Sequence, residues 1–441
     1  MTTRAGEFPC MDRRSFLRSA LAGAGALALG DALRVAALAN PAGNADEPSY
    51  GPLRAPDANG LQYPDGFTGR LIARSGLPVG LTTHLWPVFP DGAACFDRPD
   101  GAPGWILVAN SENPPPADVN LVPPVQDLMG GASAIVFNGS GKIVDAYWIL
   151  RNTQSNCAGG VTPWGTWLSC EEFDFTVRTP GAAPSAAGRV WECFPADEGG
   201  TQAKEVQMLG RFKHEAAAFD AEGRIYLTED LSDGCLYRFT PAPGLLRNKP
   251  ESLTGGTMHA LRDNEDGTVE WVGPIDPTAA TKATRLQAVE DFDATPFNGG
   301  EGCYYDNGTV LFTTKGDDKV RALSVATNEL SVLYDGRGVG SVLTGVDNII
   351  VSPHTGNIYV AEDGGDMEVV VIETDGDDRT AAPLIRATGP QHGMANPSPV
   401  PTASEITGLA LSPDGTRLYF SGQRTFGLGV TYELAKSSGT F

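Results

Sequence analysis

Asn307-Gly308 is followed by Thr309-Val310-Leu311-Phe312, so a hairpin turn stands directly before a strand of β-branched and apolar residues. Asn-Gly is a preferred pair for the two central positions of a tight hairpin. The same order, a turn that contains glycine and then a strand, recurs at 222–227, 355–360 and 414–420. This repetition predicts a chain built from antiparallel hairpins.

The rest of the chain agrees with an all-β fold. Beyond the first 39 residues, no apolar pattern keeps a helical period over several turns, whereas 54 glycines and 33 prolines can separate many short strands. The spacing of the hairpins is irregular but compatible with propeller blades of roughly 40–50 residues that carry insertions. We predict a single β-propeller of about six blades with loop insertions. A pair of β-sandwiches is the alternative that the spacing leaves open.

The N-terminus has the form of an export signal. Arg13 and Arg14 form a twin-arginine pattern ahead of an apolar stretch at 19–30, and the small residues at 37–39 offer a cleavage site. The apolar stretch is shorter than the roughly 20 residues that a transmembrane helix needs. We therefore predict a twin-arginine signal peptide at 1–39, an extended lead-in at 40–62 and a propeller domain at 63–441. The mature protein would be periplasmic or secreted, with no membrane anchor.

Composition excludes several classes of function. The formal net charge of −22 argues against nucleic acid and anionic membranes as partners, and it favours the binding of cations. With only five histidines, a zinc or copper centre dominated by imidazole is not expected. The chain also lacks a G-x-S-x-G elbow and a Walker loop, and the His214-Glu215 pair has no second histidine at zincin spacing. Six cysteines would follow the cleavage site, without a C-x-x-C pair, and their connectivity stays open.

The stretch NCAGGVTPWGTWLSCEE at 156–172 combines a thiol, close-approach glycines, two tryptophans and the neighbouring carboxylates Glu171 and Glu172. Adjacent carboxylates at the end of an apolar segment repel each other, and a metal ion would offset that repulsion. The alternative is structural: the tryptophans belong to the core, the cysteines are buried or bridged, and the carboxylates are solvated.

Other acidic residues also stand at strand ends. A propeller brings equivalent positions of successive blades together at its central channel, so carboxylates that are far apart in sequence can share hard cations. Each of them alone is equally compatible with a hairpin end. The segment 375–378 resembles part of a calcium loop but lacks the later bidentate acid. The candidate ligands outside the 156–172 stretch are Glu215, Glu229, Glu290, Asp347, Glu362, Asp363 and Glu405.

The order of four segments resembles the PhoX alkaline phosphatases: 156–172, then 210–216, then 226–230, and finally 405–408 through Gln423. The resemblance spans about residues 63 to 430. It implies a propeller whose central site holds Fe³⁺ and Ca²⁺ and whose substrates are phosphomonoesters. By this resemblance Cys157 would be a thiolate ligand to iron. The implied carboxylate ligands are Glu171 or Glu172, Glu215 and Glu290, with Asp347 and Glu405 for calcium and Glu229, Glu362 and Asp363 as further candidates.

Two segments depart from the family pattern. The family's Asn-His-Glu reads Asn110-Ser111-Glu112 here, and its Arg-Pro-Glu reads Ala288-Val289-Glu290. The arginine that would bind the substrate phosphate is therefore absent from position 288, and Arg285 is the candidate to replace it.

The function implied by the resemblance is that of a phosphatase acting on small phosphate esters. With the export signal we expect it outside the cytoplasm, and we expect it to be a monomer. Two other functions stay open, a propeller hydrolase of lactonase-like specificity and a metal-binding propeller without catalysis.

Overall fold

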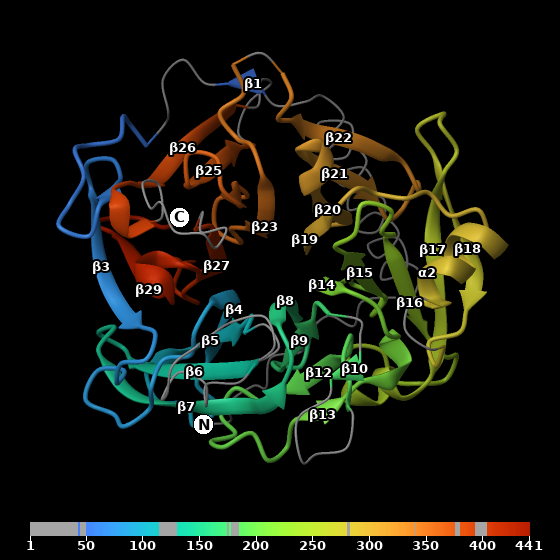
Figure 1. Ribbon diagram of the computed structural model, residues 1–441, viewed down its shortest axis with the longest axis horizontal. Helices are drawn as coiled ribbons and strands as arrows, with labels where there is room; N and C mark the ends of the chain where they lie inside the picture. Colours follow the sequence, from blue (N-terminus) through green and yellow to red (C-terminus); the bar gives the residue numbers. More distant parts are fainter. Residues whose placement is uncertain are drawn as a thin grey trace, which may run out of the picture.

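The computed structural model describes residues 43–44, 50–113, 130–173, 176–177, 185–279, 283–338, 340–374, 380–392 and 404–441. Within these residues, six sheets of four or more antiparallel strands stand in a ring around a central channel (Figure 1). The predicted all-β propeller of six blades is therefore confirmed. The expected signal peptide at 1–39 and the acidic segment at 375–378 lie outside the described residues.

Each blade is numbered by its place along the chain. Blade 1 comprises β4 (Pro90–Asp97), β5 (Gly104–Ser111), β6 (Gly130–Asn138) and β7 (Ile143–Thr153). Blade 2 comprises β8 (Asn156–Val161), β9 (Trp167–Glu171), β12 (Val190–Cys193) and β13 (Lys204–Glu205). Blade 3 comprises β14 (His214–Phe219), β15 (Ile225–Glu229), β16 (Tyr237–Pro241), β17 (Gly256–Asp263) and β18 (Val269–Ile275).

The second half of the ring follows the same plan. Blade 4 comprises β19 (Gly300–Asp306), β20 (Thr309–Thr314), β21 (Lys319–Ser324) and β22 (Leu330–Asp335). Blade 5 comprises β23 (Val346–Val351), β24 (Ile358–Glu362), β25 (Glu368–Glu373) and β26 (Thr380–Ala387). Blade 6 comprises β27 (Ile406–Leu411), β28 (Arg417–Gly422), β29 (Val430–Lys436) and β3 (Phe67–Arg74).

The remaining elements are short. Two of them, β1 (Gly43–Asn44) and β2 (Leu61–Gln62), pair with β26, while β10 (Thr176–Val177) pairs with β11 (Ser185–Ala186). A helical segment at the outer edge of blade 3 consists of α2 (Ala283–Leu286) and a π-helical turn, η4 (Gln287–Asp291). The 3₁₀ turns are η2 (Gln207–Leu209), η3 (Pro250–Thr254), η5 (Lys315–Asp317), η6 (Pro390–His392) and η7 (Thr425–Gly427).

The four predicted hairpins occupy one equivalent place. Each joins the innermost strand of a blade to its second strand, in blades 3, 4, 5 and 6. In blade 4, Asn307 and Gly308 have φ angles of 42° and 87°. Positive φ at both central positions is the requirement of a type I′ turn, which explains why an Asn-Gly pair stands there.

The ring is closed by strands from opposite ends of the chain. β3 pairs with β29 in an antiparallel register that runs from Phe67↔Lys436 to Arg74↔Val430. The segment before β3, expected to be an extended lead-in, forms β2 and contributes Leu61 to the core at 1% exposure. Tertiary pairing with β26 therefore orders a stretch that has no strand pattern of its own.

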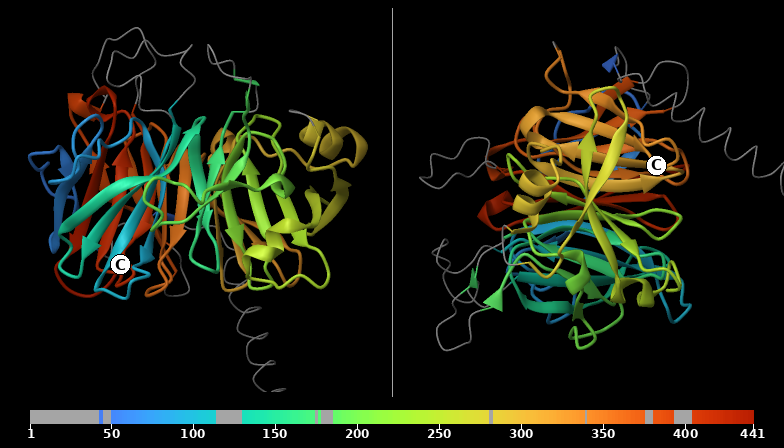
Figure 2. Two further views of the ribbon diagram at one scale, coloured as in Figure 1. Left: turned by 90° about the horizontal axis from the view of Figure 1, so that it is seen from below. Right: turned by 90° about the vertical axis from the view of Figure 1, so that its right-hand side faces the viewer.

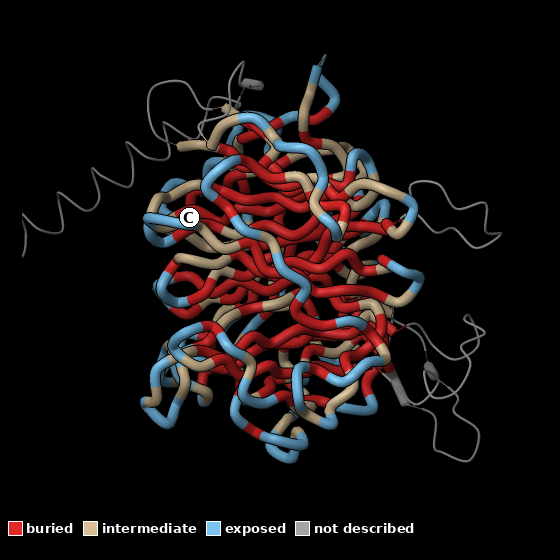
Figure 3. The backbone as a smooth tube through the Cα atoms, turned by 90° about the vertical axis from the view of Figure 1, so that its left-hand side faces the viewer, coloured by how far each residue is buried: buried red, intermediate tan, exposed pale blue. Residues whose placement is uncertain are grey.

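The core is divided among the blade interfaces. Six clusters of buried side chains lie between neighbouring blades, one at each interface. Every residue of β9 is buried, whereas the outermost strand β7 alternates between buried and exposed positions. Figure 3 shows the same distribution, with buried residues along the strands and exposed residues in the loops. No helix among the described residues is long and apolar enough to cross a membrane.

The six innermost strands are β4, β8, β14, β19, β23 and β27, and they surround the channel (Figure 1). The blades stand side by side around this axis, as Figure 2 shows from two directions. Each innermost strand has an irregular register near its start. Such bulges bend a strand and re-aim its side chains.

Candidate metal centre

The starts of the innermost strands carry most of the polar side chains of the channel. Five of the six strands place an acidic residue or a cysteine inside the irregular register, and blade 6 has Gly408 there instead. All five are buried. We call this set the inner ring, and it consists of Asp91, Cys157, Glu215, Glu301 and Asp347.

The inner ring is tight enough to hold metal ions. Three overlapping groups have ligand atoms within 4.8 Å of one another: Asp91 with Glu112 and Cys157, Cys157 with Glu172 and Glu215, and Glu215 with Glu301 and Asp347. The Cys157 thiol donates to Glu215 Oε1 over 3.0 Å. Glu215 Oε2 is buried and has no hydrogen-bond partner. A buried carboxylate oxygen without a partner is costly, and a bound cation would satisfy it.

A second set of side chains surrounds the inner ring. The residue directly after the second strand of every blade is polar, and its neighbours are the inner-ring carboxylates or one another. Because the second strand runs antiparallel to the first, its end returns to the level of the inner ring. We call this set the outer ring, and it consists of Glu112, Glu172, Asp230, Lys315, Asp363 and Gln423.

Three cations partly neutralise these carboxylates. Lys213 Nζ lies 2.8 Å from Glu172 and 3.3 Å from Asp230. Lys315 Nζ lies 2.7 Å from Glu301 and 3.1 Å from Asp363.

Arg424 completes the set at the border of blades 6 and 1. Its Nη1 lies 2.7 Å from Glu405, and its Nη2 lies 3.9 Å from Glu112. Beside it, Gln423 Nε2 donates to Asp91 Oδ2 and Glu112 Oε2 over 2.6 and 2.8 Å.

Burial and mutual repulsion disfavour the charged forms of the ring. Burial raises the pKa of Asp91 to about 6 and raises the pKa of Glu215 well above its usual value, and the neighbouring carboxylates add to the shift of Glu215. Burial likewise raises the pKa of the Cys157 thiol. Glu172 and Asp363 of the outer ring are exceptions. Burial opposes their charge, but the pKa of Glu172 is lowered by the Lys213 ammonium, and the pKa of Asp363 is lowered by its hydrogen bond with Glu405 and by the Lys315 ammonium.

Carboxylates outnumber cations in the two rings and their partners. Lys213, Lys315 and Arg424 face nine carboxylates, so the site would carry an excess of six negative charges with all nine ionised. Bound multivalent cations are the general way to stabilise such an excess. The nine carboxylates are Asp91, Glu112, Glu172, Glu215, Asp230, Glu301, Asp347, Asp363 and Glu405.

The backbone at Cys157 is held in position by Asn110, at the end of β5. Asn110 Nδ2 donates to the carbonyl oxygens of Cys157 and Ala158 over 2.9 and 2.8 Å. Asn110 Oδ1 accepts hydrogen bonds from Trp167 Nε1 and Ser169 Oγ. Trp167 is thus a core residue that, through Asn110, also supports the strand that carries the thiol, whereas Trp164 is half-buried and donates to Glu192.

Comparison with known sequences and structures agrees with this architecture. Residues 141–330 match the family described as alkaline phosphatase PhoX. This part of the chain is thus similar to the PhoX-type phosphatases. The fold of the chain is similar to that of Pseudomonas fluorescens PhoX in complex with vanadate, a transition-state analogue, with a TM-score of 0.68 and 16% identity over 88% of this chain and 97% of that one.

Two other solved structures have lower TM-scores against this chain. XC5397 from Xanthomonas campestris, a gluconolactonase, is 14% identical over 90% of this chain and 98% of its own, with a TM-score of 0.37. The holo pyranose dehydrogenase PQQ domain from Coprinopsis cinerea is 11% identical over 89% of this chain and 100% of its own, with a TM-score of 0.45. No curated protein matches the chain.

The structure brings together six of the sequence-predicted ligands. Cys157, Glu215 and Asp347 are in the inner ring, and Glu172 and Asp363 are in the outer ring. Glu405 stands just before β27, where it shares a hydrogen bond with Asp363.

Three predicted ligands face away from the rings. Glu171, Glu229 and Glu362 are each the last residue of a second strand, one position before an outer-ring residue. Their carboxylates accept backbone N–H groups: Glu171 from Gln154 and Arg189, Glu229 from Cys235, and Glu362 from Thr344 and Glu368. Their geometry is that of loop supports, because successive residues of an extended chain point in opposite directions.

Ala288-Val289-Glu290, which stands where the family has Arg-Pro-Glu, lies outside the rings. η4 is at the outer edge of blade 3, where Glu290 is exposed and Ala288 is fully buried in the core between blades 2 and 3. Arg285 forms ion pairs with Glu229 and Asp233 and with no ring residue. The structure therefore gives Arg285 and Glu290 no place in the centre, where Lys213, Lys315 and Arg424 are the cations present.

Sequence reasoning missed Asp91 and Glu301 of the inner ring, and the cationic role of Lys213, Lys315 and Arg424. The regular distance in sequence between an inner-ring residue and the outer-ring residue of the same blade could have identified some of these residues. Cys157 and Glu172, Glu215 and Asp230, and Glu301 and Lys315 are each about 15 residues apart, the length of one hairpin with two five- to six-residue strands. An ionisable residue at each end of such a hairpin is the pattern that repeats from blade to blade.

Proposed function

We propose that this chain is an exported, metal-dependent phosphatase that hydrolyses phosphate esters at the inner and outer rings. The observation that carries the proposal is the inner ring itself. It brings a thiol and several carboxylates within bonding distance of shared ions, and it leaves Glu215 Oε2 buried without a partner. The PhoX-type family and fold support the same activity.

The donor set fits two kinds of metal ion. Cys157, Glu172 and Glu215 offer a thiolate and carboxylates, a combination that suits Fe³⁺. Glu301, Asp347 and the nearby carboxylates offer oxygen only, which suits Ca²⁺ with its many ligands and flexible geometry. When bound, such cations supply charge that stabilises a phosphoryl group during transfer.

The chain's own cations would orient the substrate. Lys315 is one-third exposed at its side chain and lies between an inner-ring and an outer-ring carboxylate. Once metal ions compensate those carboxylates, the ammonium is free to donate to a phosphate oxygen. Lys213 and Arg424 also pair with carboxylates of the site, from blades 3 and 6.

The test combines elemental analysis with a substrate panel on the natively exported full chain. We expect iron and calcium in the purified protein, and hydrolysis of phosphomonoesters that is lost in Glu215→Gln together with bound metal. Metal-loaded protein that is inactive on phosphate esters and active on lactones would overturn the phosphatase and favour the lactonase-like alternative. Protein that retains neither metal nor activity would overturn both.

A matched pair of variants separates the two carboxylates that end β9. Glu172→Gln removes an outer-ring ligand and the charged partner of Lys213, so we expect lower metal content and lower activity. Glu171→Gln replaces a double acceptor of backbone N–H groups by an amide, so we expect a loss of about 1–3 kcal/mol of stability with metal content kept. The opposite assignment of the two effects would contradict the proposed ligand set.

A further inference from the structure

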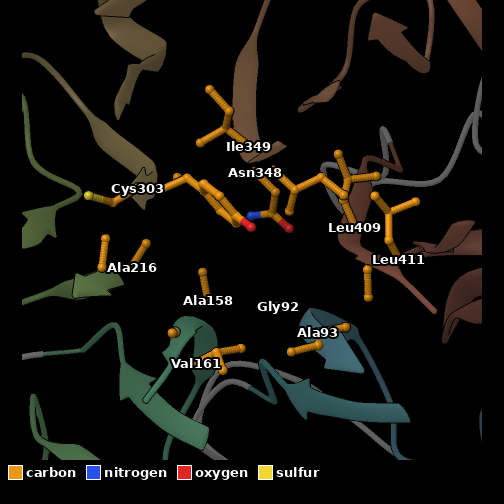
Figure 4. A pocket seen from close by; sticks show the side chains of 18 of the residues that line it. Gly92, Ala93, Ala158, Val161, Ala216, Cys303, Asn348, Ile349, Leu409 and Leu411 are labelled. Atoms are coloured by element: carbon orange, nitrogen blue, oxygen red, sulfur yellow. The ribbon is translucent and has the colours of Figure 1, made fainter. Parts of the chain in front are cut away.

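On the far side of the inner ring, the innermost strands enclose a cavity of about 430 Å³. Its walls come from the innermost strands of all six blades, beginning one residue beyond each ring position and running to the far ends of the strands. Figure 4 shows the side chains converging on this space, among them Ala93, Ala158, Ala216, Ile349 and Leu411.

The lining of this cavity differs in chemistry from the metal centre. It is formed mainly by glycine, alanine and branched aliphatic residues, with no lysine, arginine or histidine. The one carboxylate in the lining is Asp97, an exposed residue at the end of β4. An anion would find no positive partner here and would face the inner-ring carboxylates one layer above. Phosphate esters are therefore poor ligands for this cavity.

The cavity opens on the face opposite the metal centre. Its outer lining consists of the last residues of the innermost strands, whereas the inner ring stands at their starts. Val161, at the end of β8, is 47% exposed there although it is a large apolar side chain. An exposed apolar residue at the mouth of an apolar cavity favours the entry of apolar ligands.

One polar group stands at the inner end of the cavity. Asn348 Nδ2 donates to Asp347 Oδ1 over 2.8 Å, and Asn348 Oδ1 accepts from the Gly408 backbone N–H over 2.6 Å. These bonds fix the amide in the wall of the cavity, where Figure 4 shows Asn348. A primary amide has two N–H groups, so a second donor remains for a ligand that carries one acceptor.

We propose that this cavity is a second binding site, for an uncharged, largely apolar small molecule with one hydrogen-bond acceptor. Its volume is within the range of about 300–1,000 Å³ typical of small-molecule sites, and a mainly apolar lining with a few polar groups, here Asn348 with Tyr304, Tyr305 and Ser412, is their usual composition. The inference is independent of the phosphatase activity, because the cavity and the metal centre open on opposite faces and bind different chemistry.

The test is a fluorescence titration of the metal-loaded full chain with 6-propionyl-2-(dimethylamino)naphthalene, an uncharged, largely apolar probe whose ketone oxygen is a hydrogen-bond acceptor. We expect saturable binding of one probe per chain that inorganic phosphate does not displace. Ala93→Phe fills the cavity and Leu411→Asp places a charge in it, so each is expected to weaken binding at least about tenfold. Leu246→Asp is the matched control, because Leu246 is 65% exposed and lies outside the lining, and it should change affinity less than twofold.

Two results would overturn the proposal. One is the absence of saturable binding up to the solubility limit of the probe. The other is an unchanged affinity in both cavity variants, with circular dichroism showing that they are folded, since the probe would then bind elsewhere. Ala93→Phe and Leu411→Asp act by different means, so loss of folding in one leaves the other as the test.

Discussion

Neighbouring acidic residues have separate roles at the edge of the centre. In Glu171-Glu172, Glu229-Asp230 and Glu362-Asp363, the first carboxylate accepts backbone N–H groups and the second joins the outer ring. Burial raises the pKa of each first residue to about 7, and their hydrogen bonds lower it only in part. One acid in each pair thus fixes the loop that positions the other.

Replacement of Cys157 by alanine is expected to remove the thiolate ligand and lower phosphatase activity by on the order of 10²-fold, with loss of the visible absorption that a thiolate gives on Fe³⁺. Cys303→Ala is the control, because Cys303 is equally buried on the innermost strand of blade 4 but belongs to no ligand group. Iron analysis, absorption spectra and kinetics measure the effect. Full iron content and an unchanged spectrum in Cys157→Ala would rule out the ligand role.

Lys315→Met is expected to lower kcat/KM for phosphomonoesters by on the order of 10²-fold, because a charge-assisted hydrogen bond to the phosphate is lost. Metal content should be kept or increased, since an internal competitor for Glu301 and Asp363 disappears. Lys319→Met is the control: among the described residues, Lys319 forms ion pairs with Asp317 and Asp335 alone, on the same blade. Equal activity of Lys315→Met and wild type would show that another group binds the phosphate.

The residues missed by sequence reasoning share a physical reason. Asp91 stands before Gly92, and Glu301 stands between Gly300 and Gly302, so both look like turn positions. In the structure the glycines instead allow close backbone approach within the channel: a Cβ on Gly302 would lie 2.7 Å from the Ile349 backbone nitrogen. The ligands that were found, such as Cys157 and Glu215, lie in segments with additional family signals.

At the scale of the strand, hairpins were predictable and bulges were not. A hairpin depends on local turn chemistry, as at Asn307-Gly308, which is visible in the sequence. The irregular registers at the starts of the innermost strands depend on contacts between blades, which no local pattern contains. Because these irregularities coincide with the inner ring, the part of the fold hidden from local reasoning is the part that places the ligands.

Gly160 illustrates this dependence on contacts between blades. A Cβ at Gly160 would lie 1.9 Å from the Ala217 carbonyl oxygen on the innermost strand of the next blade. We expect Gly160→Ala to destabilise the protein by about 2–4 kcal/mol and to lower metal content by separating blades 2 and 3. Gly255→Ala is the control, because its Cβ would meet only Leu245 Cδ1 at 3.9 Å. Chemical denaturation measures both; equal stabilities would contradict the close packing.

At the scale of the whole molecule, the two ends of the chain close the ring. β3 and β29 belong to one blade although they come from opposite ends of the sequence, and no short-range pattern predicts their pairing. Closure places all six innermost strands around one channel. Inner-ring side chains from blades 1 to 5 therefore bring their ligand atoms close enough to share metal ions. The centre is therefore a property of the complete ring, in which many buried carboxylates are brought together at once.

This concentration of acid groups predicts how the stability of the metal-free protein depends on pH. Burial raises the pKa of Glu171, Glu229, Glu362 and Glu368 to about 7, from a usual value of 4.5, and that of Asp91 to about 6. Between about pH 4.5 and 7 the folded state then holds more protons than the unfolded state. The free energy of unfolding must fall as pH rises through this window.

Metal binding should reverse this trend, because the ligands bind cations in their deprotonated forms and affinity rises with pH. Glu172 and Asp363 have lowered pKa values, so their contribution is lost only as pH falls below about 4. We therefore expect chelated protein to be most stable near pH 4.5–5, and loaded protein to gain an increasing advantage toward pH 7. Urea denaturation of both forms across pH 4 to 7.5 measures this, and Glu362→Gln should flatten the slope of the chelated form. A chelated protein that becomes more stable from pH 5 to 7 would contradict the raised pKa values, since the folded state would then have to bind fewer protons than the unfolded chain.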